Sequence, residues 1–384
     1  MKIIFWFFCG LTFFIYCLYP VIIFLLAKIM GKEARKEEIT PFVSLIIAVH
    51  DEEKVIKDKV LNALALDYPA DKLEIIFALD GCADKTHQIL LGFSDSRIII
   101  VNNPQRLGKV AALNKTVPLA KGQIILFSDA NSIYETDALK KLIRNFADER
   151  VGCVSGRLSY LDTDSTCVGK GENLYWKYET FIKIQESKLG KLLVTNGSIQ
   201  AVRKHAYPYP DPEVADDFSI PLLIQAKKYK VLYEPEAVAY EIATQNLKEE
   251  LAQKARILSQ GFKGAIRLWK KLLNLSPLGM FELLFHKVLR WGVAFYLILI
   301  FLLNIIFIHE PFYLYILILQ IAFYSLALIG FLLRHKSKIK IFYVPFYFCL
   351  VNFAALIALY KLIRKADTRI WNKAQTTRAR RLDA

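Results

Sequence analysis

The pattern of apolar residues divides the chain into a region of short alternating segments flanked by long apolar runs. Residues 3–27 contain no charged side chain, and later charge-free runs of 18, 22 and 20 residues cover 291–308, 312–333 and 341–360. A helix of about 20 residues crosses a ~30 Å hydrocarbon core. We therefore expect an N-terminal transmembrane anchor at residues 1–30 and C-terminal transmembrane helices within residues 288–362.

The first apolar run favours a retained anchor over a cleaved signal peptide. A signal peptide has an apolar region of about 7–15 residues followed by a small-residue cleavage site. Here the run is longer, and basic residues follow it at 32–36. Because such residues stay on the cytoplasmic side, we expect a multi-pass protein of the plasma (inner) membrane with the domain that follows the anchor in the cytoplasm. Three further spans would put the tail at 363–384 outside, although its basic charge favours the inside. Either one apolar run is re-entrant or interfacial, or the tail departs from this charge bias, so its side stays open.

Residues 40–260 alternate between predicted strands and predicted helices. The expected strands are 43–49, 73–79, 97–101, 123–127, 151–155 and 231–233, and the expected helices are 52–64, 84–91, 110–120 and 136–146. This alternation predicts an α/β fold with a doubly wound, mostly parallel sheet. Residues 261–287 mix aromatic, basic and aliphatic side chains, which is typical of amphipathic helices in a membrane interface.

The composition agrees with one such domain joined to membrane segments. The chain has 384 residues, of which 54% are hydrophobic and 23% charged. Its net charge of +15 comes largely from basic residues close to apolar runs, which favours anionic lipid headgroups over nucleic acid as the partner. The six cysteines have no C-x-x-C spacing, which is typical of a reduced cytoplasmic domain.

Polar residues follow four of the expected strands at the point where each strand ends. They lie at 50–53, 80–84, 108–109 and 129–131. In open parallel sheets, ligands bind beyond the carboxyl ends of the strands, so we expect these turns to face one crevice. The last of them, Asp-Ala-Asn, offers oxygen ligands for a hard divalent cation that could hold a diphosphate. Each turn alone could equally be a loop or a helix cap.

These segments resemble the family 2 glycosyltransferases with a GT-A fold, in the membrane-anchored branch related to cellulose, hyaluronan and poly-N-acetylglucosamine synthases. The resemblance covers about residues 40–260. It is carried by Ala48-Val-His-Asp-Glu-Glu-Lys-Val-Ile56, by Asp80-Gly-Cys-Ala-Asp-Lys-Thr86, and most specifically by Arg106-Leu-Gly-Lys-Val-Ala-Ala-Leu-Asn114. Asp51 stands where the family usually has Asn, and Cys82 where it has Ser.

The resemblance implies a nucleotide-sugar site at the ends of these strands. Glu52, Asp80 and Lys109 would contact the nucleotide, and Asp129 would bind a Mg²⁺ or Mn²⁺ ion that bridges the diphosphate. A divalent ion and a lysine both stabilise the charge of a leaving nucleoside diphosphate. Asn131, the second expected metal ligand, stands where some relatives carry an Asp. This difference implies weaker metal binding unless the nucleotide completes the coordination shell.

The later part of the domain resembles the acceptor and catalytic elements of the family. Thr195-Asn-Gly-Ser-Ile-Gln-Ala-Val-Arg203 is similar to its "GxxxAxR" element, which implies that Asn196, Gly197 and Ser198 lie near the acceptor. Asp216-Asp217 matches its acidic pair, whose second member is the catalytic base. A neighbouring buried carboxylate raises the pKa of such a base. Two carboxylates before a short helix could also simply cap it.

Gln253-Lys-Ala-Arg256-Ile257 resembles the "QxxRW" motif of processive synthases, with Ile257 in place of Trp. The resemblance implies that Gln253 and Arg256 belong to the nucleotide site, where the guanidinium contacts the diphosphate. The missing Trp favours transfer of one or a few sugars over processive synthesis. The aromatic residues between 175 and 181 could stack on sugar rings, but their arrangement favours an amphipathic helix that faces the core.

Together these features predict a membrane-bound, metal-dependent, inverting glycosyltransferase. It would move a sugar from a nucleotide-diphosphate donor, with a UDP-sugar expected, to a lipid-linked or polysaccharide acceptor at the membrane. Membrane lipids and other proteins of envelope polysaccharide biosynthesis are further expected partners, and no nucleic acid is expected. A processive polysaccharide synthase remains an alternative. So does a non-catalytic membrane subunit that binds nucleotide or glycan on a GT-A scaffold.

Overall fold

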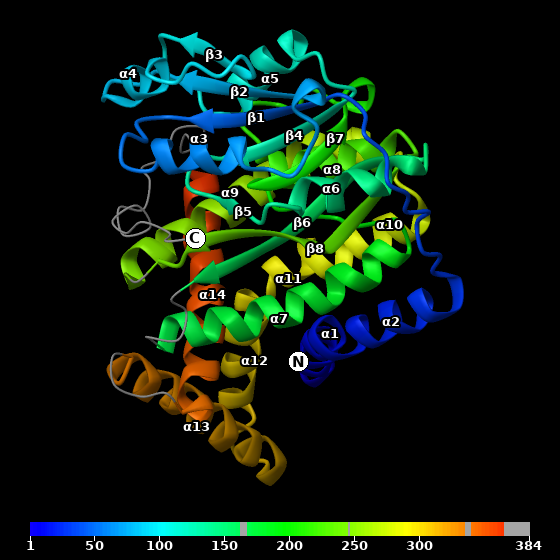
Figure 1. Ribbon diagram of the computed structural model, residues 1–384. Helices are drawn as coiled ribbons and strands as arrows, with labels where there is room; N and C mark the ends of the chain where they lie inside the picture. Colours follow the sequence, from blue (N-terminus) through cyan, green and yellow to red (C-terminus); the bar gives the residue numbers. More distant parts are fainter. Residues whose placement is uncertain (162–166, 245, 335–338, 365–384) are drawn as a thin grey trace.

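The computed structural model describes residues 1–161, 167–244, 246–334 and 339–364. Its centre is one eight-stranded sheet in the order β3-β2-β1-β4-β7-β6-β8-β5 (Figure 1). The strands are β1 (Val43–Val49), β2 (Leu73–Asp80), β3 (Ile98–Asn103), β4 (Ile124–Asp129), β5 (Ile133–Tyr134), β6 (Val151–Leu161), β7 (Ile199–Arg203) and β8 (Lys230–Ile242). The predicted α/β fold is confirmed, and the sheet is mixed.

The first four strands of the chain form the parallel half of the sheet. β1 pairs in parallel with both β2 and β4, and β2 pairs in parallel with β3. β1 and β2 are buried along almost their whole length, as expected for apolar strands covered on both faces. Ala48 lies beside Asp129 in the register, and Asp80 lies beside Asn103. The polar turns after these strands therefore share one edge of the sheet.

The other half of the sheet contains antiparallel pairs, and two of its strands are longer than the sequence predicted. β7 pairs antiparallel with both β4 and β6, and β8 runs parallel to β6 but antiparallel to β5. The predicted strands at 151–155 and 231–233 extend to Leu161 and Ile242. They are longer because β6 and β8 pair with each other across a large sequence separation, through a register shift after Gly156.

Helices cover both faces of the sheet. In chain order they are α3 (Ile56–Leu64), α4 (Thr86–Leu91), α5 (Lys109–Thr116), α6 (Ala138–Ile143), α7 (Cys167–Lys188), α8 (Asp216–Ala226) and α9 (Leu247–Leu272). α3 and α6 pack on one face with Leu45 and Ile47 of β1. α5 and α8 pack on the other face with Ile46. The alternating residues of β1 thus belong to two separate hydrophobic cores, as in a doubly wound sheet.

Three helices of the described residues are long and apolar enough to cross a membrane, at Lys2–Met30, Pro311–Leu332 and Lys340–Ile363. A further candidate is the pair Pro277–Trp291 and Val293–Ile306, which bends by 56°. The individual helices are α1 (Lys2–Phe13), α2 (Tyr19–Met30), α10 (Pro277–Glu282), α11 (Leu289–Trp291), α12 (Val293–Ile306), α13 (Pro311–Leu332) and α14 (Lys340–Ile363). These helices agree with the membrane association predicted from the apolar runs.

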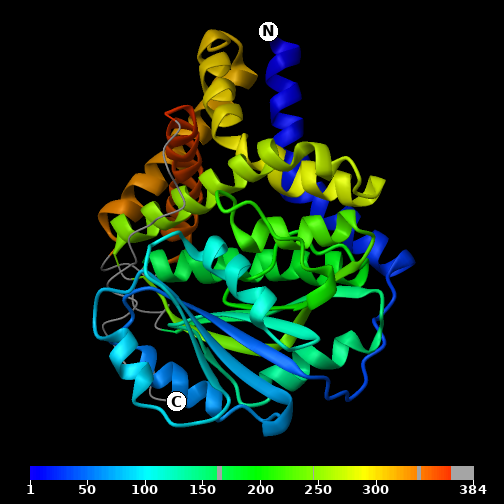
Figure 2. The same cartoon turned by 90° about the horizontal axis from the view of Figure 1, so that it is seen from above.

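The N-terminal helices join the apolar helices to the α/β domain. Phe5 of α1 packs with Ile300 of α12 and Tyr313 of α13. Both views show α1 and α12 projecting beyond the sheet together (Figures 1 and 2). Tyr19 of α2 instead packs with Ile182 of α7. The first apolar segment therefore contacts other apolar helices at one end and the α/β domain at the other.

Helix α14 lies along α9. Tyr347 Oη donates to Glu250 (3.2 Å), and Ser259 Oγ donates to the carbonyl oxygen of Ala358 (3.3 Å). In its most apolar stretch 44% of the residues are buried, against 17% for α13. This packing favours the prediction that one apolar run is not a simple span. The basic tail at 365–384 lies outside the described residues, so its side of the membrane stays open.

Candidate active site

A cavity of about 800 Å³ lies beyond the carboxyl ends of the parallel strands. All four polar turns predicted to share a crevice contribute to its lining. So do the later predicted site residues on the β7 loop, α8 and α9. The predicted residues that line it are Glu52, Asp80, Lys109, Asp129, Asn131, Asn196, Gly197, Ser198, Asp216, Asp217, Gln253 and Arg256. The fold thus brings together residues separated by about 200 positions in the sequence, while their individual roles stay predictions.

The turn after β2 is tied to the loop before α5 by one carboxylate. Asp80 accepts backbone N–H groups from Leu107 (2.7 Å) and Gly108 (2.8 Å). Gly81 has φ +63°, and a Cβ there would lie 2.6 Å from the backbone nitrogen of Arg106. Only glycine therefore fits this close approach without strain. The Asp80 carboxylate holds the loop that presents Lys109 to the cavity.

The turn after β1 shows why an Asp can replace the family's usual Asn at position 51. Asp51 has φ +48°, a left-handed conformation that Asp and Asn adopt more readily than other side chains. Its Oδ1 accepts the backbone N–H of Ala83 (2.7 Å). The backbone N–H of Glu52 donates to Thr86 Oγ1 (2.8 Å). The turns after β1 and β2 are therefore bound to each other, and Glu52 is buried between them.

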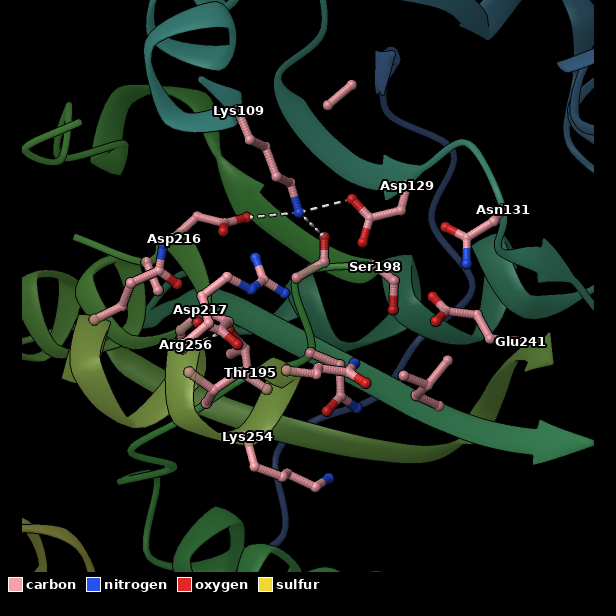
Figure 3. Close-up of a pocket in the computed structure, with 18 of the residues that line it drawn as sticks. Lys109, Asp129, Asn131, Thr195, Ser198, Asp216, Asp217, Glu241, Lys254 and Arg256 are labelled. Atoms are coloured by element: carbon pink, nitrogen blue, oxygen red, sulfur yellow. Dashed lines mark hydrogen bonds and ion pairs between the residues drawn. The ribbon is translucent and has the colours of Figure 1, made fainter. Parts of the chain in front are cut away.

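Lys109 connects the metal-ligand position to the acidic pair. Its Nζ lies 2.8 Å from Asp129 Oδ1 and 3.1 Å from Asp216 Oδ2, and it donates to the carbonyl oxygen of Gly197 (3.2 Å) (Figure 3). Burial alone would lower the pKa of this ammonium, but the two carboxylates outweigh burial and raise the pKa well above its ordinary value. Lys109 is therefore a permanent cation at the centre of the site.

Gly197 allows this close approach. A Cβ at this position would lie 3.0 Å from Asp216 Oδ2 and 3.1 Å from Lys109 Nζ. Any side chain at position 197 would therefore press on the ion pair from the β7 side. This contact gives a physical reason for a glycine in the predicted acceptor segment.

The acidic pair does not cap α8 through a side chain. The N-cap residue is Ala215, and the two aspartates occupy the first turn. Asp216 is buried, whereas Asp217 is half-buried and lines the cavity. Burial, and next the charge of Asp216, raise the pKa of Asp217 to about 6 against the opposing effect of nearby cations. A carboxylate with this pKa is suited to accept a proton near neutral pH.

The predicted acceptor segment is fixed by its neighbours. Asn196 Nδ2 donates to the carbonyl oxygen of Gly156 (2.6 Å), and its Oδ1 accepts from Lys183 Nζ (2.9 Å). The carbonyl oxygen of Ser198 accepts from Tyr134 Oη (2.7 Å). The Asn196 side chain is thus part of the cavity wall, and it links the wall to a lysine that the sequence analysis did not single out.

Sequence reasoning missed three cavity residues on α7. Tyr175, Trp176 and Lys183 all line the cavity, and Tyr175 also packs against a hydrophobic cluster that includes Tyr347, so both interpretations of these aromatic residues stay open. α7 follows residues outside the described part of the chain and carries a weak amphipathic pattern. The aromatic residues of α7 were the only feature of its sequence that could have predicted a place in the site. The local sequence pattern does not show that the helix passes beneath the site.

Sequence reasoning also missed a residue that supports the turn that carries Asp129. Lys59 of α3 is completely buried, and its Nζ donates to Ser128 Oγ (2.7 Å) and to the carbonyl oxygen of Ser132 (2.5 Å). Burial lowers the pKa of Lys59 to about 7. The sequence feature that could have identified Lys59 is its position on the apolar stripe of a helix. A charge at such a position is costly without a specific partner.

The predicted metal position has two candidate oxygen ligands, Asp129 and Asn131, and both line the cavity. Asn131 lies on the same side of the cavity as Asp129 (Figure 3). Glu241 of β8, later in the chain, accepts a hydrogen bond from Ser132 Oγ. The described residues contain no group of three His, Cys, Asp or Glu side chains that could hold a metal ion. A metal here would therefore need most of its ligands from a diphosphate and water.

The sheet, the strand-end turns and the paired carboxylates define a protein of the GT-A glycosyltransferase fold. A mannosyltransferase from Pyrobaculum calidifontis, solved in complex with GDP-Man and Mn²⁺, matches with a TM-score of 0.68 and 20% identity. The match covers 94% of this chain and 99% of that one. The likeness therefore extends through the apolar helices as well as the sheet.

Sequence comparison gives the family. Residues 44–208 match the model of Glycosyl transferase family 2. The chain is 24% identical over 254 residues to the poly-beta-1,6-N-acetyl-D-glucosamine synthase of Staphylococcus aureus, covering 64% of this chain and 61% of that protein. It is 28% identical over 199 residues to the beta-monoglucosyldiacylglycerol synthase of Trichormus variabilis, covering 50% and 42%. Residues 44–208 of the α/β domain thus match a family 2 glycosyltransferase domain.

Proposed function

We propose that this protein is a membrane-bound inverting glycosyltransferase. In the proposed reaction an acceptor hydroxyl oxygen attacks the anomeric carbon of a nucleotide-diphosphate sugar. Asp217 takes the hydroxyl proton as the nucleoside diphosphate leaves. The observation that carries this proposal is that Asp217, Asp216, Lys109 and Asp129 line the same cavity. The pKa of Asp217 is raised, and the ion pairs of Lys109 with Asp216 and Asp129 lie beside it.

The donor end of the cavity is suited to a diphosphate. Lys109 is a cation fixed by two carboxylates, and Arg256 lines the same cavity from α9. Fixed cations aimed at a leaving group stabilise the charge that develops there without reorganisation during the reaction. A bound diphosphate would compete with Asp129 for Lys109 and so free that carboxylate for a metal ion.

Asp129 and Asn131 are the residues that would hold a divalent ion, Mg²⁺ or Mn²⁺. Carboxylate and amide oxygens are ligands that suit both ions, and Asp129 already faces a cation at 2.8 Å. A bound ion would neutralise charge on the leaving diphosphate. The Mn²⁺ in the mannosyltransferase of the same fold supports this assignment.

The acceptor is proposed to be a membrane-associated lipid-linked or polysaccharide molecule. α9, which carries Gln253 and Arg256, packs along α14, an apolar helix. This neighbourhood supports delivery of the acceptor from the membrane side. The names of the two matched synthases describe a glycan product and a glucosyldiacylglycerol product, which supports this class of acceptor. A UDP-sugar is the proposed donor, as the resemblance implies.

The test is nucleoside diphosphate release from UDP-, GDP- and dTDP-sugars by the detergent-purified protein with Mg²⁺ or Mn²⁺ and membrane lipid extract. We expect release from one donor class, its loss in EDTA, and a fall of about 10²–10⁴-fold in the Asp217→Asn variant. The variant should bind the nucleotide as the wild type does. Nucleotide binding without release from any donor would favour the non-catalytic subunit. Release that survives in Asp217→Asn would contradict the assignment of the base.

A further inference from the structure

The end of the cavity opposite the strand turns has a different character from the donor end. There two lysines approach the ring of Trp176 of α7, with its ring centroid 5.5 Å from Lys183 Nζ and 5.6 Å from Lys254 Nζ. Lys287 lines the same end. Figure 3 shows the Lys254 side chain pointing away from Lys109 and Asp129. We call Trp176, Lys183, Lys254 and Lys287 the lysine–tryptophan end.

Lys183 is the buried cation of this group. Its side chain is 4% exposed and donates to Asn196 Oδ1, and within the described residues no carboxylate lies within ion-pair distance of it. The carboxylates whose charges reach it are Asp217, Glu179 and Glu186. Glu179 is held by Lys287 and Arg290, and Glu186 is held by His286. A buried ammonium without a close anion is costly, so an anionic ligand would be favoured here.

A second, smaller cavity of about 50 Å³ adjoins the lysine–tryptophan end. The two cavities share the lining residues Tyr175, Leu258, Lys287 and Val351. Beyond them the small cavity is lined by Tyr16 of the N-terminal segment, by His286, Arg290 and Trp291, and by residues 352 and 355 of α14. The polar end of the large cavity therefore leads toward the apolar helices, the direction from which a membrane lipid would arrive.

We propose that the lysine–tryptophan end binds the phosphate group of a lipid acceptor, with Lys183 and Lys254 as its cationic contacts and the lipid chain directed toward α14. This inference rests on the proposed function and narrows its acceptor to a phosphate-bearing lipid. A neutral glycan stacked on Trp176 would leave the Lys183 charge uncompensated. Burial, and next the charge of Lys287, lower the pKa of Lys183 to about 8, and a bound phosphate would reverse that shift.

The test measures binding of dodecyl phosphate to the full chain in phosphatidylcholine nanodiscs, with empty nanodiscs as the background. Saturating UDP and GDP with Mg²⁺ block the donor end. We expect binding to the wild type to weaken on the order of tenfold in Lys183→Met and in Lys254→Met, because each loses a charge-assisted contact. Lys183→Arg should retain binding. Lys115→Met, which removes an exposed lysine of α5, should behave as the wild type.

Three outcomes would overturn the inference. Equal dodecyl phosphate binding by the wild type and both methionine variants would show that the lysines are not contacts. Equal competition by dodecyl maltoside would indicate a neutral glycan site. Equal competition by inorganic phosphate would indicate an anion site that does not use the lipid chain. Nucleotide binding, measured separately on every variant, reports on the proposed function and on folding, so that failure of either idea is recognised by itself.

Discussion

The two ends of the cavity differ in how their charges are compensated. At the donor end, Lys109 contacts Asp129 and Asp216, and the Asp80 carboxylate is satisfied by two backbone N–H groups. At the lysine–tryptophan end, Lys183 is buried with one amide as its hydrogen-bond partner. The donor end is thus a preorganised set of ion pairs. At the other end Lys254 and Lys287 pair with Glu250 and Glu179, whereas Lys183 has no carboxylate within ion-pair distance among the described residues. The difference teaches that the charges within one cavity can be compensated to different degrees, which is the basis for proposing two ligand sites there.

Removing the central cation should have the largest effect on this contrast. Lys109→Met leaves Asp129 and Asp216 without their shared partner, and we expect donor turnover to fall about 10²–10³-fold. Thermal unfolding should also show a loss of stability. That loss should stay below the about 3–5 kcal/mol typical of a fully buried pair, because the Asp129 side chain is 35% exposed. Turnover within twofold of wild type would show that the mechanism does not require Lys109.

Crowding the same ion pair should have the next largest effect. In Gly197→Ala the new Cβ would press on Asp216 and Lys109, and we expect a loss of roughly tenfold in turnover because the charges shift by a few tenths of an ångström. Gly10→Ala in α1 is the matched control, since a Cβ there has no atom within 4 Å. Kinetics of the two variants side by side check the prediction. Equal activity would show that the close packing at Gly197 is not required.

The pH dependence should report Asp217. Because burial and Asp216 raise the pKa of Asp217 to about 6, the ionised base is lost below that pH and present above it. We expect kcat/KM to rise about tenfold per pH unit below pH 6 and to level off above it. Initial rates from pH 4.5 to 8 on the wild type provide the measurement. A flat profile across pH 5–7 would argue against a titrating base in this range.

The smallest expected effect is at the lysine–tryptophan end. Trp176→Leu keeps an apolar side chain but removes the ring beside Lys183 and Lys254. We expect the acceptor KM to rise a few-fold, as a contact worth about 0.5–1.5 kcal/mol would predict, with the donor KM unchanged. A change in the donor KM alone would contradict the placement of Trp176 at the acceptor end of the cavity.

Much of the donor end could be predicted because its residues belong to short local patterns. Asp80 and Asp129 end the strands β2 and β4, Lys109 follows β3 after a short loop, and parallel pairing brings these strand ends together. The lengths of β6 and β8 could not be predicted, since they depend on pairing between segments about 80 residues apart. Trp176 and Lys183 were missed for the same reason. Their positions depend on the packing of α7 beneath the sheet, which leaves little trace in the local pattern.

The most direct test of the central claim is the stereochemistry of the transfer. Once the donor is identified, NMR of the anomeric proton gives the configuration of the sugar in the product. A single displacement assisted by Asp217 predicts the configuration opposite to that of the donor. Retention of the donor configuration would contradict the assignment of Asp217 as the base of a direct displacement.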